Sequence, residues 1–267
     1  RLVPITALRH LYKLLRCFPN REFHLAVAKE FNRLPNKVSK LVAESREHFA
    51  LYDNRGEAFH NRNKPLTEAL KANRKLANTL VQRFAALGEK SVNVSSAKNF
   101  NFQYVDYEIS PFRTTKSTFD NGGSGKRTGT GGMDLLLINS NDQTPIVGEI
   151  KADTDVNPFL GLIQCLMYAV ELSTESPRAR LNQFYPERFA DGTSAPGIDI
   201  YLFLLRYPQK QVSKEFLTLT DRLSASLMAD NMPGLGFIRR IVALENPMSE
   251  SSSNSFSVAF AHEHDRH

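Results

Sequence analysis

Two short, largely hydrophobic runs, residues 133–138 and 146–152, are separated by a cluster of turn-forming residues. Asp134 is the charged residue within the first run, and Glu149 and Lys151 are the charged residues within the second. Apolar runs of this length, bounded by turn signals, are typical of buried strands. The pattern therefore predicts a buried hairpin that contains three charged side chains.

A strongly apolar helix is predicted to follow, at about residues 157–172. Its hydrophobic residues lie almost all round the helix, which indicates that it is buried. Gln164 and Tyr168 are four residues apart and therefore share one face. A buried amide and a buried phenol both need hydrogen-bond partners. Either the two satisfy each other or a backbone carbonyl, or they belong to a functional site.

Further strands and helices are predicted on both sides of this segment. Alternating or continuous apolar patterns indicate three more strands and two more helices. The strands are expected at residues 102–109, 198–205 and 237–244, and the helices at residues 63–88 and 215–228. Helix, three strands, helix, strand, helix and strand in this order predict an α/β fold with a mixed sheet flanked by helices.

The first 62 residues show a different pattern. Helices are predicted at residues 5–17 and 22–31 and from residue 36 onward, followed by a strand-like segment at 49–52, a turn at 53–56 and a short strand at 58–60. This order resembles a winged helix-turn-helix, which implies a small DNA-binding domain. Its recognition helix and wing would present Lys37, Ser39, Lys40, Arg46 and Arg55. The alternative is a plain three-helix bundle that serves dimerisation or packing.

These patterns divide the chain into three parts. We expect a winged-helix-like DNA-binding domain over residues 1–62, the α/β domain over residues 63–247, and a flexible tail over residues 248–267. The tail is rich in serine and then in histidine, a composition typical of a disordered terminus. The chain begins with Arg1 rather than Met, which leaves open whether an upstream segment precedes it.

The charged residues of the predicted hairpin suggest a specific chemistry. Side chains alternate along a strand, so Glu149 and Lys151 project from the same face, and Asp134 can lie across from them. Two carboxylates and one ammonium in an apolar setting are costly unless they are paired or metal-bound. Oxygen-only ligands with one or two carboxylates suit Mg²⁺ or Mn²⁺. A neighbouring lysine can then orient or deprotonate a water molecule that attacks a phosphodiester.

The pattern resembles the PD-(D/E)XK nuclease superfamily, through Asp134 and the triplet of Glu149, Ile150 and Lys151. Gln164 and Tyr168 look like the Gln-x-x-x-Tyr motif of the RecB-like and lambda-exonuclease-like branch. The resemblance implies a restriction-endonuclease-like fold in which Asp134, Glu149 and the carbonyl of Ile150 hold the metal. It also implies that Lys151 positions the water, and that Gln164 and Tyr168 orient the site and a DNA strand. The alternative is that the Glu-x-Lys triplet lies on a solvated face, as such triplets usually do.

Other residues are weaker candidates for the same site. Glu68 and Glu108 are candidates for an extra metal-binding carboxylate, and the alternative for Glu108 is a solvent-facing side chain. Residues 114–132 contain six glycines and several basic residues, so this loop is expected either to close over a DNA backbone or to be an ordinary disordered loop. The candidate DNA contacts in and beside it are Arg113, Lys116, Lys126 and Arg127.

Composition limits the class of protein and its surroundings. Of the 267 residues, 41% are hydrophobic and 23% are charged, which is typical of a globular protein. No apolar run approaches the roughly 20 residues that cross a bilayer, and no signal peptide is evident. Cys17 and Cys165 do not have the spacing of a disulfide framework or a metal site, so a cytoplasmic location without membrane attachment is expected.

Charge is distributed unevenly along the chain. Residues 1–90 contain 18 Lys and Arg against 8 Asp and Glu, whereas residues 91–267 contain 16 against 20. This asymmetry favours an N-terminal part that meets a polyanion and a remainder that carries acidic metal ligands. The sequence therefore predicts a Mg²⁺- or Mn²⁺-dependent deoxyribonuclease that acts on duplex DNA or its ends.

Two other functions are compatible with the sequence. One is a DNA-binding or regulatory protein that uses the nuclease fold as a scaffold, and the other is a nuclease that acts on RNA. A homodimer and a protein partner in a larger system are both left open. Endonuclease or exonuclease behaviour and the biological pathway are left open as well.

Overall fold

The computed structural model describes residues 7–17, 20–51, 59–60, 75–95, 97–114, 133–152, 157–189, 197–208, 210–229, 232–246 and 255–264. Several residues predicted to belong to the site lie outside these ranges, namely Arg55, Glu68, Lys116, Lys126 and Arg127. Arg113 belongs to a described strand, but the prediction for its side chain also falls outside the described part.

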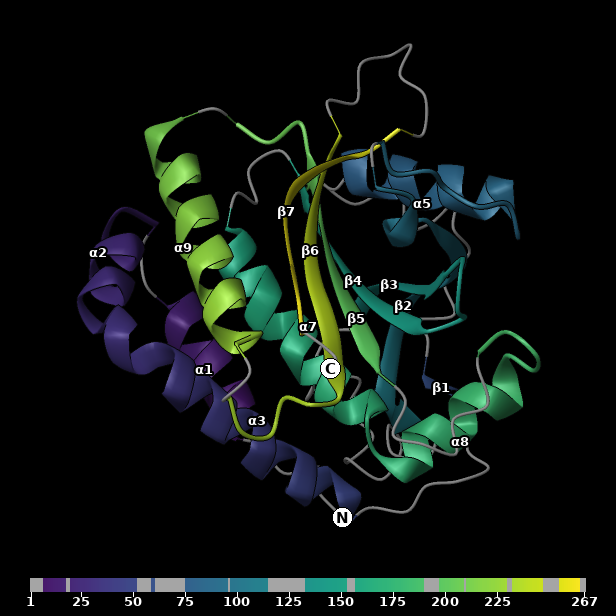
Figure 1. Cartoon of the computed structure of the whole chain (residues 1–267), viewed down its shortest axis with the longest axis horizontal. Coiled ribbons are helices and arrows are strands. Elements are labelled where there is room, and N and C mark those ends of the chain that lie inside the picture. The colour runs from purple at the N-terminus through teal and green to yellow at the C-terminus, as the bar shows by residue number, and fades with distance from the viewer. Residues whose placement is uncertain are drawn as a thin grey trace, which may run out of the picture.

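Six strands lie side by side in chain order and form one mixed sheet (Figure 1). They are β2 (Phe102–Thr114), β3 (Met133–Asn139), β4 (Pro145–Ala152), β5 (Ile198–Leu205), β6 (Ile238–Asn246) and β7 (Ser257–Glu263). β2, β3 and β4 form an antiparallel meander, β4, β5 and β6 are parallel, and β7 is antiparallel to β6. The two-residue strand β1 (Phe59–His60) pairs with β2.

Helices cover both faces of this sheet (Figure 1). α7 (Pro158–Leu172) and α9 (Gln211–Leu227) pack on one face, and α5 (Lys75–Leu87) packs on the other. α8 (Glu175–Phe184) follows α7, and η1 (Phe31–Arg33) and η2 (Lys98–Phe100) are short 3-10 helices. The predicted α/β fold with a mixed sheet flanked by helices is therefore confirmed.

The two faces of the sheet have separate hydrophobic clusters because successive side chains of a strand point in opposite directions. Leu136 and Val147 belong to the cluster under α7 and α9, whereas Leu135, Leu137 and Phe203 belong to the cluster under α5. With both faces covered, the central strands are apolar almost without interruption. A charged side chain on either face is therefore an exception that requires a partner.

The three N-terminal helices form an outer layer over α7 and α9 (Figure 1). They are α1 (Ala7–Arg16), α2 (Asn20–Glu30) and α3 (Leu34–Ala50). Phe23 of α2 contacts Phe159 of α7 and Phe216 of α9 edge-on, each with 5.5 Å between ring centroids. The domain boundary at residue 62 stays a prediction, but the helices before it share one hydrophobic core with the helices of the sheet.

The predicted strand-like segment at residues 49–52 is wrong for residues 49 and 50, because α3 continues to Ala50. Val38, Val42, Ser45 and Phe49 are all buried and recur at helical spacing. Packing along this helical face therefore prevails over the local strand preference of the sequence.

The predicted flexible tail is wrong for Ser257–Glu263, which form the edge strand β7. The segment is anchored at its start by Phe256, which is fully buried among the aromatic residues under α5. His262 lies on this strand, and its Nε2 is 2.7 Å from Oδ1 of Asp221 in α9. The serine-rich composition before the strand is typical of disorder, so the sequence did not indicate that this segment pairs with β6.

Candidate active site

The β3–β4 hairpin places the three predicted charged residues together. Leu135 lies opposite Gly148, so the antiparallel register places Asp134 opposite Glu149. Lys151 is two residues further along β4 and faces the same side. All three are buried, with exposed fractions of 9% for Asp134, 2% for Glu149 and 4% for Lys151.

Short polar contacts hold this cluster together. Lys151 Nζ donates to Glu149 Oε1 at 3.1 Å, and the backbone N–H of Ile150 donates to Asp134 Oδ2 at 2.9 Å. The ion pair offsets part of the cost of burying these charges. The formal charges of Asp134, Glu149 and Lys151 sum to −1.

Ile150 has a backbone role in this cluster rather than a side-chain role. Its side chain is buried on the opposite face of the sheet, under α5. Its N–H points toward β3, where it reaches Asp134. Because the N–H and C=O of one strand residue point to the same neighbour, the carbonyl of Ile150 also points toward β3. The predicted carbonyl ligand is thus directed to the same side as the Asp134 carboxylate.

α7 covers the cluster and contributes Tyr168. This side chain is only 1% exposed. Burial raises the pKa of the Tyr168 hydroxyl well above its ordinary value, and the nearby carboxylates of Glu149, Glu171 and Asp134 raise it further. The phenol therefore stays neutral and acts as a hydrogen-bonding group beside the carboxylates, not as a base.

Gly161 lets α7 approach the cluster closely. A Cβ atom at this position would lie 2.7 Å from Cε of Lys151 and 3.3 Å from Cγ of Glu149. Any larger residue would therefore displace the lysine side chain. Sequence reasoning missed Gly161, although an isolated glycine inside an apolar helix indicates a packing or functional reason.

Gln164 connects α7 to the N-terminal helices. The hydroxyl of Tyr12 in α1 donates to Gln164 Oε1 at 3.1 Å. The two residues are 152 positions apart in sequence, so no local spacing could have predicted this contact. α1 was expected in a separate DNA-binding module, but it lies against the helix that covers the candidate site.

Cys165 lies on the same helix but is unreactive. It is fully buried, and its Sγ donates to the carbonyl oxygen of Val147 at 3.9 Å. Burial raises the pKa of the thiol well above its ordinary value, and the charges of Glu149 and Asp134 add to this effect. The thiolate is the reactive form of cysteine, so Cys165 serves packing.

Glu108 lies in the same cross-strand row as the two carboxylates. Tyr107 pairs with Leu135 and Ile109 pairs with Met133, so the register places Glu108 across from Asp134. Its φ angle is 51°, in the left-handed region that residues other than glycine rarely adopt. Such strain is found preferentially at functional sites.

The predicted recognition helix is only partly available to a partner. Lys37 and Lys40 are exposed on α3, and Lys40 Nζ lies 3.9 Å from Glu44 Oε1. Ser39 is buried and donates to the carbonyl of Pro233 at 2.5 Å. Its predicted role in DNA contact is therefore wrong, because position 39 lies on the face of α3 that packs inward.

Arg46 is also engaged within the molecule. Its Nε donates to Ser173 Oγ at 3.1 Å, and its guanidinium carbon lies 5.2 Å from the ring centroid of Phe237. Residues 39 and 46 are seven apart and thus share the inward face of α3. Arg46 is half-buried, so part of its guanidinium is engaged inside the molecule, and its placement on the recognition surface stays a prediction.

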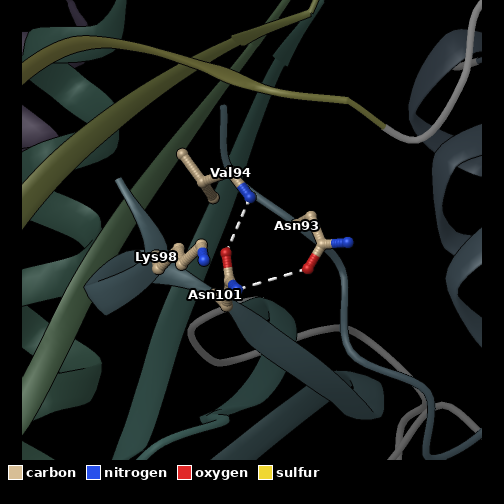
Figure 2. A pocket seen from close by; sticks show the side chains of 4 residues that line it. All are labelled: Asn93, Val94, Lys98 and Asn101. Atoms are coloured by element: carbon tan, nitrogen blue, oxygen red, sulfur yellow. Dashed lines mark hydrogen bonds between the residues drawn. The ribbon is translucent and has the colours of Figure 1, made fainter. Parts of the chain in front are cut away.

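A hollow lies beside the start of β2 (Figure 2). It is next to the β3–β4 turn, where Asn141 Nδ2 donates to the carbonyl of Lys98 at 3.2 Å. It is lined by Asn93, Val94, Lys98 and Asn101. Asn101 accepts from the Val94 N–H at 2.8 Å and donates to Asn93 at 3.2 Å. These hydrogen bonds hold the loop together, and they do not form a reactive arrangement.

No family model matches the chain, and no curated protein or solved structure matches it. Among the described residues there is no group of three or more His, Cys, Asp or Glu side chains arranged to hold a metal ion. None of the helices in the described ranges combines the length and the apolar character needed to cross a membrane.

Proposed function

We propose that this chain is a divalent-metal-dependent nuclease that hydrolyses phosphodiester bonds in DNA. One observation carries the proposal. Two carboxylates and a lysine from adjacent strands are buried together beneath a helix that presents a glutamine and a tyrosine. The resemblance of these residues to PD-(D/E)XK nucleases supports the same conclusion, as does the order of helix, three-stranded meander, helix and parallel strand.

The donor set fits Mg²⁺ or Mn²⁺. Asp134 and Glu149 lie opposite each other on neighbouring strands, and the Ile150 carbonyl is directed to the same side. These are hard oxygen ligands, and two carboxylates leave room for water and a substrate phosphate. The chemistry supplied by a bound ion would be polarisation of a phosphoryl oxygen and activation of water.

The remaining residues have distinct roles in this proposal. Lys151 is held 3.1 Å from Glu149, where its ammonium can orient the attacking water and offset phosphate charge. The neutral hydroxyl of Tyr168 can donate to an oxygen at the reacting centre. Tyr12 occupies the oxygen of the Gln164 amide, which directs the amide N–H groups to other acceptors such as phosphate oxygens.

Glu108 is the residue that we propose as the extra carboxylate. Its register position places it in one row with Asp134 and Glu149 across β2, β3 and β4. In a Glu108→Gln variant, we expect the metal concentration required for half-maximal cleavage to increase. DNA binding in EDTA should be unchanged. Equal metal dependence in the variant and the parent would remove Glu108 from the site.

The decisive experiment is a cleavage assay with linear duplex, circular duplex and single-stranded DNA and with RNA, in Mg²⁺, Mn²⁺ or EDTA. The parent is compared with Lys151→Met, and the exposed Lys98→Met serves as the charge-matched control. We expect metal-dependent cutting that falls by about 10²–10⁴-fold in Lys151→Met and is unchanged in Lys98→Met. Cutting of the circular substrate would identify an endonuclease.

A second candidate function is nucleic-acid binding without cleavage. The ion pair of Lys151 and Glu149 and the hydrogen bond from Ile150 to Asp134 stabilise the cluster from within, as expected in a scaffold. In that case the parent would bind DNA but cut none of the four substrates with either metal. Cutting of the RNA alone would instead identify a ribonuclease with the same site.

A further inference from the structure

The orientation of α1 places a row of basic residues beside the candidate site. Leu8, Leu11 and Leu15 are buried and fix the inward face of the helix. Each residue advances about 100° round the helix, so Arg9, Lys13 and Arg16 fall on one line beside that face. We call these three residues the α1 basic stripe.

Tyr12 lies between the buried leucines and the α1 basic stripe. Its hydroxyl donates to Gln164 on α7, so this edge of α1 faces the candidate active site. Arg9 lies one helical turn before Tyr12. Burial lowers the pKa of its guanidinium, and the nearby Glu171 and Tyr168 of α7 act in the opposite direction. Arg9 therefore continues the stripe past the Tyr12–Gln164 contact, toward Tyr168 and Glu171 of α7.

The other two members of the stripe are open to a partner. Lys13 and Arg16 are exposed. Arg16 lies seven residues after Arg9, or about 10 Å along the helix axis, which corresponds to the rise of about three nucleotides in one strand of duplex DNA. A row of cations of this length beside a phosphodiester site fits the adjoining phosphates of the same strand.

We propose that the α1 basic stripe binds the sugar-phosphate backbone next to the reacting phosphodiester, and that the Tyr12–Gln164 hydrogen bond fixes the stripe to the site. This proposal rests on the proposed nuclease function. It differs from the sequence-based expectation, in which α3 supplied the recognition surface. The stripe carries no information about base sequence, because phosphate contacts position a protein without reading bases.

The first test compares two double variants that each remove two exposed positive charges. Lys13→Gln with Arg16→Gln changes the stripe, whereas Lys90→Gln with Lys98→Gln changes the opposite end of the sheet. Binding of a labelled duplex oligonucleotide is measured by fluorescence anisotropy with Ca²⁺ at several salt concentrations. We expect the slope of log K against log salt to decrease by about 1.8 in the stripe variant, because each lost phosphate contact removes about 0.9.

Three outcomes are informative. An unchanged salt slope in the stripe variant overturns the proposal, even if the parent cuts DNA. An equal decrease in the control variant also overturns it, because the effect would then reflect net charge alone. Failure of the parent to bind or cut any nucleic acid overturns both this proposal and the proposed function.

The second test concerns Tyr12 as a positioning residue. Tyr12→Phe keeps the ring and removes only the hydroxyl that reaches Gln164. We expect kcat to decrease by roughly five- to tenfold, the equivalent of one hydrogen bond, with the melting temperature and the salt slope unchanged. Combining Tyr12→Phe with Gln164→Ala should add little to the effect of Gln164→Ala alone. Additive losses would show that the two residues act independently and would overturn the coupling.

Discussion

Two clusters of buried charges lie on opposite faces of the same sheet, and they are organised differently. Asp199 at the start of β5 is fully buried under the α5 side, and Arg239 binds it through two contacts, Nε to Oδ1 at 2.8 Å and Nη2 to Oδ2 at 2.7 Å. Arg240 Nε lies 3.4 Å from the same carboxylate. On the other face, Lys151 Nζ lies 3.1 Å from Glu149 Oε1, and Asp134 Oδ2 accepts from the backbone N–H of Ile150 at 2.9 Å.

The difference separates a structural charge cluster from a candidate site. In the Asp199 cluster, the rigid, planar donors of two guanidinium groups occupy the oxygens of one carboxylate, so we call this cluster saturated. Arg239 also binds Asp142 in the β3–β4 turn. Two carboxylates beside one lysine sum to −1, and the lysine is a point charge on a flexible stem. The Asp199 cluster therefore fixes β5, β6 and a turn, whereas the proposed function assigns a cation to the Asp134 cluster.

Removing one partner of the Asp199 cluster gives the largest expected effect on stability. Arg239→Met should lower the free energy of unfolding by about 3–5 kcal/mol, because it leaves a fully buried carboxylate without its main counter-charge. Urea unfolding measures this loss. The proposed nuclease activity per folded molecule, assayed at low temperature, should remain at the parent level. Loss of activity in the folded fraction would show that the two clusters are not independent.

The second-largest expected effect is stabilisation by metal, which should depend on the Asp134 cluster and not on the Asp199 cluster. If Mg²⁺ binds the folded state alone, a concentration 100 times the dissociation constant raises the free energy of unfolding by about 2.7 kcal/mol. Thermal unfolding in MgCl₂, with ionic strength matched by NaCl, measures this gain. We expect the gain to disappear in Glu149→Gln and to persist in Asp199→Asn. An equal gain in Glu149→Gln would place the ion elsewhere.

The third prediction uses a pair of glycines on the two faces of the sheet. Gly161→Ala would bring a Cβ to 2.7 Å from Lys151 Cε, and Gly148→Ala would bring one to 2.9 Å from Leu135 Cβ. Both substitutions add a methyl group to a tightly packed site, which should lower the free energy of unfolding by about 1–3 kcal/mol. At position 161, the higher helix propensity of alanine should restore about 1 kcal/mol. We expect Gly161→Ala to lose about 10²-fold in cleavage, because a small displacement of Lys151 is sufficient.

Gly148→Ala is the matched control for this effect. It should reduce stability at least as much as Gly161→Ala while keeping most of the cleavage activity, because its Cβ meets hydrophobic side chains under α5. Both quantities are obtained from the same preparations by urea unfolding and by a cleavage assay. Parallel losses in the two variants would mean that Gly161 matters for packing alone.

These contrasts also show what could be predicted from the sequence. The hairpin, the covering helix and the common face of Asp134, Glu149 and Lys151 follow from periods of two and 3.6 residues, which are local properties of the chain. The saturated Asp199 cluster was not predicted. Its partners come from β5, β6 and a turn, and only the register of parallel strands brings them together.

The remaining unpredicted contacts have the same origin in tertiary packing. Ser39 and Arg46 are polar residues of a basic segment, and nothing in their spacing shows that α3 turns them toward Pro233 and Ser173. Tyr12 reaches Gln164 only because α1 packs on α7. Helix period and charge indicate which residues share a face, but the partner of that face is set by the whole fold.

The smallest expected effect concerns the two carboxylates that share Arg239. Burial raises the pKa of Asp199, in spite of its hydrogen bonds and ion pairs with Arg239 and Arg240. Burial also acts to raise the pKa of Asp142, but the hydrogen bonds from Arg239 and Thr144 outweigh it, so the pKa of Asp142 is lowered. The two groups should therefore affect stability with opposite dependence on pH.

Whether each carboxylate raises or lowers the free energy of unfolding as pH rises depends on whether the folded or the unfolded state binds its proton more tightly. Charged Asp142 stabilises the fold above its unfolded pKa, and this contribution is lost as pH falls through its lowered folded pKa. Asp199 holds its proton more tightly in the folded state, so stability is lost as pH rises from its unfolded pKa to its raised folded pKa. Asp142→Asn should thus cost about 0–1 kcal/mol at neutral pH, since the pair is partly exposed, and nothing at low pH.

Urea unfolding of the parent, Asp142→Asn and Asp199→Asn from about pH 3 to pH 7 tests this difference, because that interval covers the ordinary range of carboxyl pKa values. The stability of the parent relative to Asp142→Asn should rise with pH. Its stability relative to Asp199→Asn should fall over the interval in which Asp199 loses its proton. If both relative stabilities changed with pH in the same direction, Arg239 would stabilise the two carboxylates alike. Arg240 would then be the residue that distinguishes Asp199 from Asp142.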